Sequence, residues 1–366
     1  MKWSIRIGSI LGIPVKVHIT FLLLLALIYF VGPSIIGIGG LKGVIFVLLV
    51  FASVVFHEMS HAMVARYYGI EVSDITLLPI GGVARMATPP EKPRQEMIIS
   101  AAGPMASLVL GFSLWFAADL LGNPVTISDL SVQGNLLAQL SAVNFVLAIF
   151  NLLPAFPMDG GRVLRGFLGL YLSPWKATRI AVGVGQAFAI VLFFLGILGG
   201  NLFVILIALF VYLGAEAEER QMGIMLSLGH ATAQTAMIRD VVTLSPGQTV
   251  GEAAERYAHG FQSDFPVMEG RRPVGLVTRE ILIETLHKQG TSVPVEEIMV
   301  KDFSVANEQT PLIEILEKMQ SSERKVVPVL KSGDLVGLIT LEQIGRYNML
   351  CSGFSCEFLE PGKART

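Results

Sequence analysis

The feature that most constrains this chain is a long run without any charged residue, residues 180–215. A helix that crosses a bilayer needs about 20 mostly apolar residues, so this run is too long for a single span. Gly199, Gly200 and Asn201 interrupt it, and glycine clusters of this kind favour a tight turn. The run therefore predicts two membrane helices joined by a turn. In the whole chain only 15% of residues are charged, against about 25% in soluble proteins.

Four further apolar segments are candidates for membrane helices. They lie at residues 17–31, 41–66, 97–118 and within 130–158. Together with the two helices of the long run, they predict an α-helical polytopic membrane domain with six transmembrane helices. Membrane lipid is then a partner of this part of the chain.

The positions of lysine and arginine predict the orientation of these helices. Positive charges precede the first helix and occupy the connections after the second and fourth helices, whereas the connections after the third and fifth contain none. Because positively charged loops stay on the cytoplasmic side, we expect a multi-pass protein of the cell membrane with both termini in the cytoplasm. The formal net charge of −2 provides no basic field for nucleic acid, so we expect no nucleic-acid partner.

The charge-rich C-terminal part contains an internal repeat. Segments 265–267 and 275–278, with the sequences FPV and GLVT, recur at 327–329 and 337–340 as VPV and GLIT. An amphipathic segment precedes each copy, and short strands that alternate with helices predict an α/β module for each. We therefore expect a membrane domain at 1–223, a linker at 224–235, modules at 236–292 and 293–350, and a tail at 351–366.

The second apolar segment ends in the sequence His57-Glu58-Met59-Ser60-His61. On a helix, residues four apart lie on one face with their Cβ atoms about 5–6 Å apart, so both imidazoles can bind one zinc ion. Glu58 lies beside them, where its carboxylate can accept a proton from water. The alternative is that these polar residues only end the helix, but ionisable residues within membrane segments are costly and usually functional.

A hydrolytic zinc site usually has three protein ligands and one open position, and Asp159 is the candidate for the third ligand. It follows the proline-broken end of the fourth apolar segment and precedes Gly160 and Gly161, for which we expect a tight, exposed turn. The predicted topology places Asp159 at the same cytoplasmic end as the two histidines. The alternative is a loop carboxylate paired with Arg162 or Arg165.

These two motifs together resemble the site-2 protease family of intramembrane zinc metalloproteases. The resemblance implies one Zn²⁺ per chain, bound by His57, His61 and Asp159, with Glu58 as the catalytic acid–base. It also implies that Asn151 helps to hold the substrate or the oxyanion, whereas the alternative for Asn151 is a polar residue that satisfies helix backbone. The implied function is hydrolysis of peptide bonds within or near the transmembrane segment of a single-span membrane protein substrate.

Residues 77–85, between the second and third helices, resemble the short membrane-associated β loop of that family. The segment contains a Gly-Gly pair and is too short to span. Physically, a strand edge near the zinc can pair with an extended substrate backbone, and the alternative is an ordinary interfacial turn. Residues 101–104, in the third helix, form a small-residue patch that suits close helix packing.

The repeated modules resemble a tandem pair of cystathionine-β-synthase (CBS) domains in the cytoplasm. The resemblance implies regulation by a cytoplasmic signal, with an adenine nucleotide as a candidate ligand. In the family's ribose-binding pattern Thr278 and Thr340 match, but Ile281 and Gln343 stand at the aspartate positions. Three options stay open: weak nucleotide binding, binding through other residues, or a surface that forms a homodimer.

Two other functions compete with the protease. A transporter or channel gated by the CBS pair predicts ionisable residues through several helices, yet the third, fifth and sixth helices contain no charged residue. A non-catalytic relative that binds transmembrane helices need not keep the base and the ligands together, and here all are present. Cys351 and Cys356 match neither a zinc motif nor a disulfide framework, so we expect free thiols.

Overall fold

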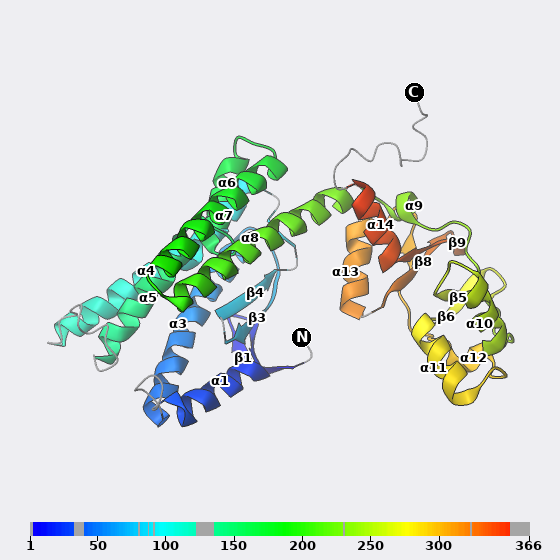
Figure 1. The fold of residues 1–366 in the computed structure, drawn as a ribbon, viewed down its shortest axis with the longest axis horizontal. Helices are drawn as coiled ribbons and strands as arrows, with labels where there is room; N and C mark the ends of the chain where they lie inside the picture. The colour runs from blue at the N-terminus through cyan, green and yellow to red at the C-terminus, as the bar shows by residue number, and fades with distance from the viewer. Residues whose placement is uncertain are drawn as a thin grey trace. The chain divides into compact units, whose positions relative to one another are not determined.

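The computed structural model describes residues 3–32, 40–79, 81–86, 88–90, 92–121, 135–229, 231–322 and 324–351. The chain divides into two compact units, residues 1–220 and 221–366, and each is described by itself (Figure 1).

Helices make up most of the first unit. Each apolar segment predicted to cross a membrane forms a helix, and the additional helix α6 follows the proline-containing segment after α5. The helices are α1 (Ile19–Phe30), α3 (Gly40–Tyr67), α4 (Pro93–Leu120), α5 (Leu136–Leu152), α6 (Asp159–Gly169), α7 (Pro174–Leu198) and α8 (Leu202–Gly229), the last of which continues into the second unit.

Among the described helices, α3, α4 and α7 are long and apolar enough to cross a membrane. Helix α1 has 12 residues and α5 has 17. At 1.5 Å per residue these helices measure about 18 Å and about 26 Å, short of a hydrocarbon core of roughly 30 Å. In α8, Glu216, Glu218 and Glu219 interrupt the apolar run. The predicted count of six spans is therefore not confirmed, because apolar composition located the helices without fixing their lengths.

A four-stranded sheet accompanies the helices of the first unit, in the order β1-β2-β3-β4. The strands are β1 (Ser4–Ile10), β2 (Ile13–His18), β3 (Val72–Leu78) and β4 (Gly81–Met86). β2 and β3 run parallel, and the other neighbours are antiparallel. The segment expected to form a membrane-associated β loop contributes to β3 and β4, but its association with the membrane is not confirmed. Strands β1 and β2 were not predicted, because their residues were assigned to the flank of the first apolar segment.

One face of this sheet packs against α3. Alternate residues of β2 are buried, as are most residues of β3, and they form one apolar cluster with the inner face of α3. The cluster includes Ile13, Val17, Ile75, Leu77, Phe51, Met59 and Ala62. This packing holds the edge strand β4 against the same helix.

The second unit contains two copies of one helix–hairpin–helix module, as the repeat predicted. The first copy has α10 (Val250–His259), β5 (Phe265–Glu269), β6 (Arg272–Val277) and α11 (Arg279–Gln289), and the second has α13 (Leu312–Ser322), β8 (Val326–Lys331), β9 (Asp334–Thr340) and α14 (Leu341–Cys351). Short elements α9 (Ala233–Ala236), α12 (Val295–Ile298) and β7 (Ala306–Asn307) connect them. Leu276 packs with Val326 and Leu338, which joins the two hairpins.

Cys351 ends α14 and is disulfide-bonded, so the expectation of a free thiol is wrong for this residue. The spacing of the two cysteines matches no known framework pattern, whereas a disulfide requires only that two cysteines approach within bonding geometry. Cys356 lies outside the described residues.

Candidate metal centre

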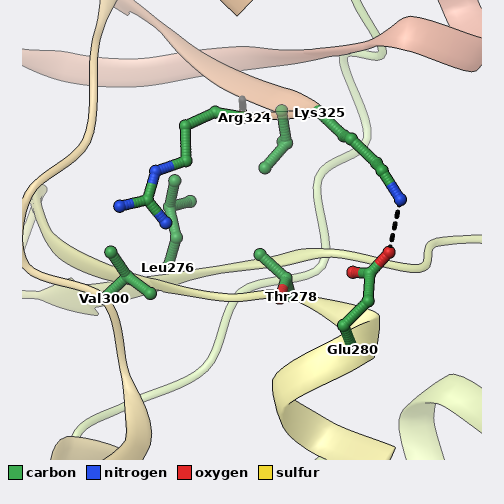
Figure 2. Close-up of a pocket in the computed structure, with 7 residues that line it drawn as sticks. Leu276, Thr278, Glu280, Val300, Arg324 and Lys325 are labelled. Carbon is green, nitrogen blue, oxygen red and sulfur yellow. Dashed lines mark hydrogen bonds and ion pairs between the residues drawn. The ribbon is translucent and has the colours of Figure 1, made fainter. Parts of the chain in front are cut away.

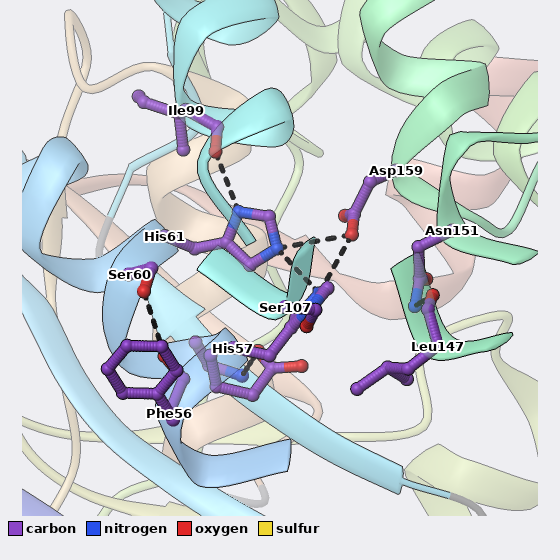
Figure 3. Close-up of polar contacts among 11 residues, drawn as sticks. Phe56, His57, Ser60, His61, Ile99, Ser107, Leu147, Asn151 and Asp159 are labelled. Atoms are coloured by element: carbon purple, nitrogen blue, oxygen red, sulfur yellow. Dashed lines mark hydrogen bonds and ion pairs between the residues drawn. The ribbon is translucent and has the colours of Figure 1, made fainter. Parts of the chain in front are cut away.

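Helix α3 presents His57 and His61 on one face. Their Nε2 atoms lie 3.1 Å apart, and both side chains are buried. Oδ2 of Asp159 lies 3.1 Å from each of these nitrogens, as Figure 3 shows. The structure thus brings together the three residues singled out as metal ligands, from two helices that are far apart in the sequence.

Two glycines determine where Asp159 lies. A Cβ on Gly160 would lie 2.2 Å from the carbonyl oxygen of Leu153, and one on Gly161 would lie 2.7 Å from the carbonyl carbon of Ala155. Real Cβ contacts essentially never come below 3.0 Å, so side chains are excluded at both positions. The prediction of an exposed turn is wrong, because both glycines are buried in the first turn of α6. They let α6 fold tightly against the segment that precedes it.

Each imidazole is held through its second ring nitrogen. Nδ1 of His61 lies 2.6 Å from the carbonyl oxygen of Ile99. Because a carbonyl only accepts hydrogen bonds, Nδ1 carries the hydrogen, and in the neutral ring Nε2 then keeps a lone pair that can bind a metal. Nδ1 of His57 lies 2.9 Å from Oγ of Ser107, a fully buried residue. Both supporting groups belong to α4.

Helix α4 approaches α3 so closely at this point that only glycine fits. A Cβ on Gly103 would lie 2.2 Å from Nε2 of His61 and 2.5 Å from Nε2 of His57. The small-residue patch therefore allows close packing, as predicted, but the packing occurs against the ligand nitrogens. Sequence analysis missed Ser107, for which the only signal was its place four residues after Gly103, on the same face of α4.

Glu58 lies against the edge strand β4. Its Oε2 accepts a hydrogen bond from the backbone N–H of Ala84 at 3.2 Å. A Cβ on Gly82 would lie 2.6 Å from Cγ of Glu58, which accounts for the second glycine of the Gly-Gly pair. Glu58 directly follows the ligand candidate His57 in α3. Glu58 is therefore placed between the cluster and a strand edge.

Asn151 lies in the last turn of α5. Its Nδ2 donates to the carbonyl oxygen of Leu147 at 2.8 Å, which is the backbone-satisfying arrangement considered as the alternative. Figure 3 draws this bond to one side of the cluster. Asn151 forms no hydrogen bond with the cluster in the described part of the chain. One amide hydrogen and Oδ1 remain for another partner.

The carboxylate of Asp159 is not paired with either arginine considered as an alternative. Arg165 instead contacts Glu96 and Glu218. The side-chain contacts found for the Asp159 carboxylate among the described residues are those with Nε2 of the two histidines. The ligand interpretation is therefore the one that this geometry favours.

The donor set fits zinc. Two imidazole nitrogens and one carboxylate oxygen are typical of catalytic zinc sites, which keep a fourth position open. All three ligand atoms lie within 4.8 Å of one another. The Nε2 lone pair of His61 and the electron-rich Oδ2 of Asp159 are only 3.1 Å apart, an arrangement that a shared cation stabilises. Imidazole ligands also favour zinc over magnesium or calcium.

The second unit contains a pocket of about 280 Å³, drawn in Figure 2. Apolar and charged side chains both line it: Leu276, Thr278, Glu280, Val300, Arg324, Lys325 and Val326. Nζ of Lys325 lies 2.6 Å from Oε1 of Glu280. Oγ1 of Thr278 accepts from the N–H of Ile281 and caps α11. The hairpin strand β6 contributes to the pocket through Leu276.

Comparison with known proteins assigns both units. Residues 45–130 and 116–195 match peptidase family M50, and residues 233–288 and 295–348 match the CBS domain. A zinc metalloprotease of Methanocaldococcus jannaschii is 37% identical over 348 residues, covering 94% of this chain and 96% of the relative. A Synechocystis protein, provisionally named a zinc metalloprotease, is 30% identical over 362 residues, covering 93% of this chain and 94% of the relative.

A solved structure, the site-2 protease from Methanocaldococcus jannaschii, is 42% identical in sequence. The match covers 60% of this chain and 96% of the solved chain, with a TM-score of 0.45. The full-length relatives include the CBS pair as well as the membrane part, so both resemblances found in the sequence are confirmed. The chain belongs to the M50, or site-2 protease, family of intramembrane zinc metalloproteases and carries a C-terminal pair of CBS domains.

Proposed function

We propose that His57, His61 and Asp159 bind one zinc ion per chain and that the protease acts at this centre. The observation that carries the proposal is the convergence of three ligand atoms while Nδ1 of His61 is held by the Ile99 carbonyl oxygen. In the neutral imidazole that bond places the hydrogen on Nδ1 and leaves the lone pair of Nε2 for a metal. When bound, zinc supplies the Lewis acidity that makes a water molecule easier to deprotonate.

Glu58 is the proposed acid–base. Its carboxylate accepts a proton from the attacking water and returns that proton to the leaving amine nitrogen as the peptide bond breaks. The Ala84 N–H holds Oε2, so the carboxylate keeps one orientation through both transfers. Asn151 is proposed to hold the substrate or the oxyanion with the amide atoms that its bond to Leu147 leaves free.

The proposed substrate is the transmembrane segment of a single-span membrane protein. An extended peptide can add to the free edge of β4, which ends the sheet order and borders Glu58. A helical segment must first unwind, because helical hydrogen bonds shield its peptide groups, so glycine, proline or asparagine near the cut should favour cleavage. We further propose that the β3–β4 hairpin lies at membrane depth and that both termini are cytoplasmic.

The CBS pair is proposed to regulate the protease, with an adenine nucleotide as candidate ligand of the pocket in the second unit. Arg324 and Lys325 suit phosphate, and the apolar side chains of the lining suit a base. The ribose would lack its usual acid partner, since Ile281 and Gln343 stand at those positions. The competing role for the pair is homodimerisation. A protein that forms dimers through the CBS pair but binds no nucleotide would favour that role.

The test compares the full-length wild type with Glu58→Gln in detergent, each with a panel of single-span substrates. The wild type should contain about one zinc per chain and cut at least one substrate, and a chelator should abolish cutting. Glu58→Gln should keep its zinc and lose cleavage by a factor of about 100 or more. Undiminished cleavage by Glu58→Gln would refute the acid–base assignment, and a zinc-free wild type would refute the metal centre.

A further inference from the structure

Away from the metal centre, the first unit buries a cluster of three charged side chains. Arg165 of α6 meets Glu96 of α4 and Glu218 of α8, and the three side chains are 14%, 15% and 16% exposed. Nε and Nη2 of Arg165 both donate to Oε1 of Glu96, the former at 2.7 Å. Nη1 donates to Oε1 of Glu218 at 2.6 Å. Charges this deeply buried need their partners, so the cluster ties three helices together in one arrangement.

Arg165 also supports both flanks of Asp159. It lies on α6, the helix that Asp159 begins. Its guanidinium carbon lies 5.2 Å from the ring centroid of Phe156, a fully buried residue of the segment before Asp159. This separation is within the range of about 6 Å for cation–π attraction. A displacement of Arg165 would therefore disturb the chain on either side of the aspartate.

Helix α8 also contacts the segment that precedes Asp159. A Cβ on Gly214 would lie 2.6 Å from Cδ of Pro157, so α8 packs directly against the chain that leads to Asp159. One turn further along α8, Glu218 engages Arg165. Helix α8 is continuous from Leu202 to Gly229 and passes from the first unit into the second.

We propose that the Glu218–Arg165 ion pair is a positioning device for the metal ligand Asp159. The pair holds α6 in the orientation that brings Oδ2 of Asp159 to the two imidazoles. Neither Glu218 nor Arg165 touches the three metal-ligand residues, and both act on Asp159 through α6 and Phe156. The proposal rests on the proposed metal centre, and it makes the position of α8 a determinant of metal affinity.

The same helix offers a matched control. Glu216 pairs with Arg220 at 2.9 Å on the surface, with side chains 47% and 74% exposed, and an exposed pair contributes little. Glu218→Gln and Glu216→Gln remove the same charge two residues apart. Arg165→Lys is a third variant, which keeps the charge but loses the planar fork that reaches two acids at once.

Zinc affinity is measured on full-length protein by competition with a chelating dye, and kcat and KM on a single-span substrate. Glu218→Gln should weaken zinc binding by about three- to tenfold and lower kcat with KM unchanged. Arg165→Lys should act in the same direction, and Glu216→Gln should match the wild type. In the double variant of Glu218→Gln with Arg165→Met, the loss of zinc affinity should equal that of Arg165→Met alone, because a replaced Arg165 no longer contacts Glu218.

Wild-type zinc affinity in folded Glu218→Gln would overturn the proposal. So would a lower Tm without weaker zinc binding, since the pair would then support the fold alone. Additive losses in the double variant would show that the two residues act separately, which also contradicts it. If the wild type binds zinc with the expected variant pattern but cuts no substrate, the proposed protease mechanism fails while the positioning role stands.

Discussion

Substitution of Gly103 by alanine tests the packing of the metal centre most directly. The added Cβ would lie 2.2 Å from Nε2 of His61, whereas ordinary van der Waals contact begins at 3.4 Å, so the helix or the ring must move by about 1.2 Å. Zinc–ligand distances tolerate deviations of only about 0.2 Å. The displacement is several times that tolerance, and Gly103→Ala should therefore lose zinc. We expect the content to fall from about one zinc per chain to below about 0.1.

The assay measures zinc per folded chain after purification, together with cleavage of a single-span substrate. Gly183→Ala provides the control, because Gly183 lies in the membrane helix α7 with no atom within 4 Å of the added Cβ. That variant should keep its zinc and gain slightly in stability, since alanine is favoured over glycine in helices. Full zinc content and normal cleavage in Gly103→Ala would refute the close approach of α4 to the ligand nitrogens.

Three further changes have defined outcomes. Ser107→Ala should weaken zinc affinity by about 10- to 100-fold, whereas Ser141→Ala, which removes an equally buried hydroxyl in α5, should leave it unchanged. Gly82→Ala should keep zinc and lower kcat, because its Cβ would displace Glu58; a loss of zinc would contradict this. Burial raises the pKa of Asp264, so stability is lost as pH rises through the raised value. Asp264→Asn should therefore raise the Tm of the second unit at about pH 7 but not near pH 3, and equal gains at both would exclude the effect.

Most of the site could be predicted from the spacing of residues along the chain. The i,i+4 spacing of His57 and His61 requires only that the segment be helical, and α3 satisfies it. Asp159 could be singled out because few acids occur near the fourth apolar segment. The environment of Gly160 and Gly161 was predicted wrongly. The close contact with the Leu153 carbonyl arises because α6 packs against the segment before it, and no local sequence pattern indicates that packing.

Features that depend on distant segments could not be predicted. Gly103 and Ser107 become part of the site only because α4 packs across α3. Strand β2 pairs with β3, which follows it in the sequence only after α1 and α3, so the local pattern could not indicate its partner. The repeat in the second unit was predictable because the chain itself contains both copies, and each supplies the pattern for the other.

Helix α5 packs along α4, and as a membrane span it would be shorter than the hydrocarbon core of a typical bilayer. With 17 residues it falls about 4 Å short of the hydrocarbon thickness. Lipid beside a short helix adapts by thinning, at a cost of a fraction of a kcal/mol per Å. Headgroups and interfacial water would then come closer to the end of α5, where the chain turns toward Asp159. A locally compressed bilayer would deliver water for hydrolysis without a pore through the full depth of the membrane.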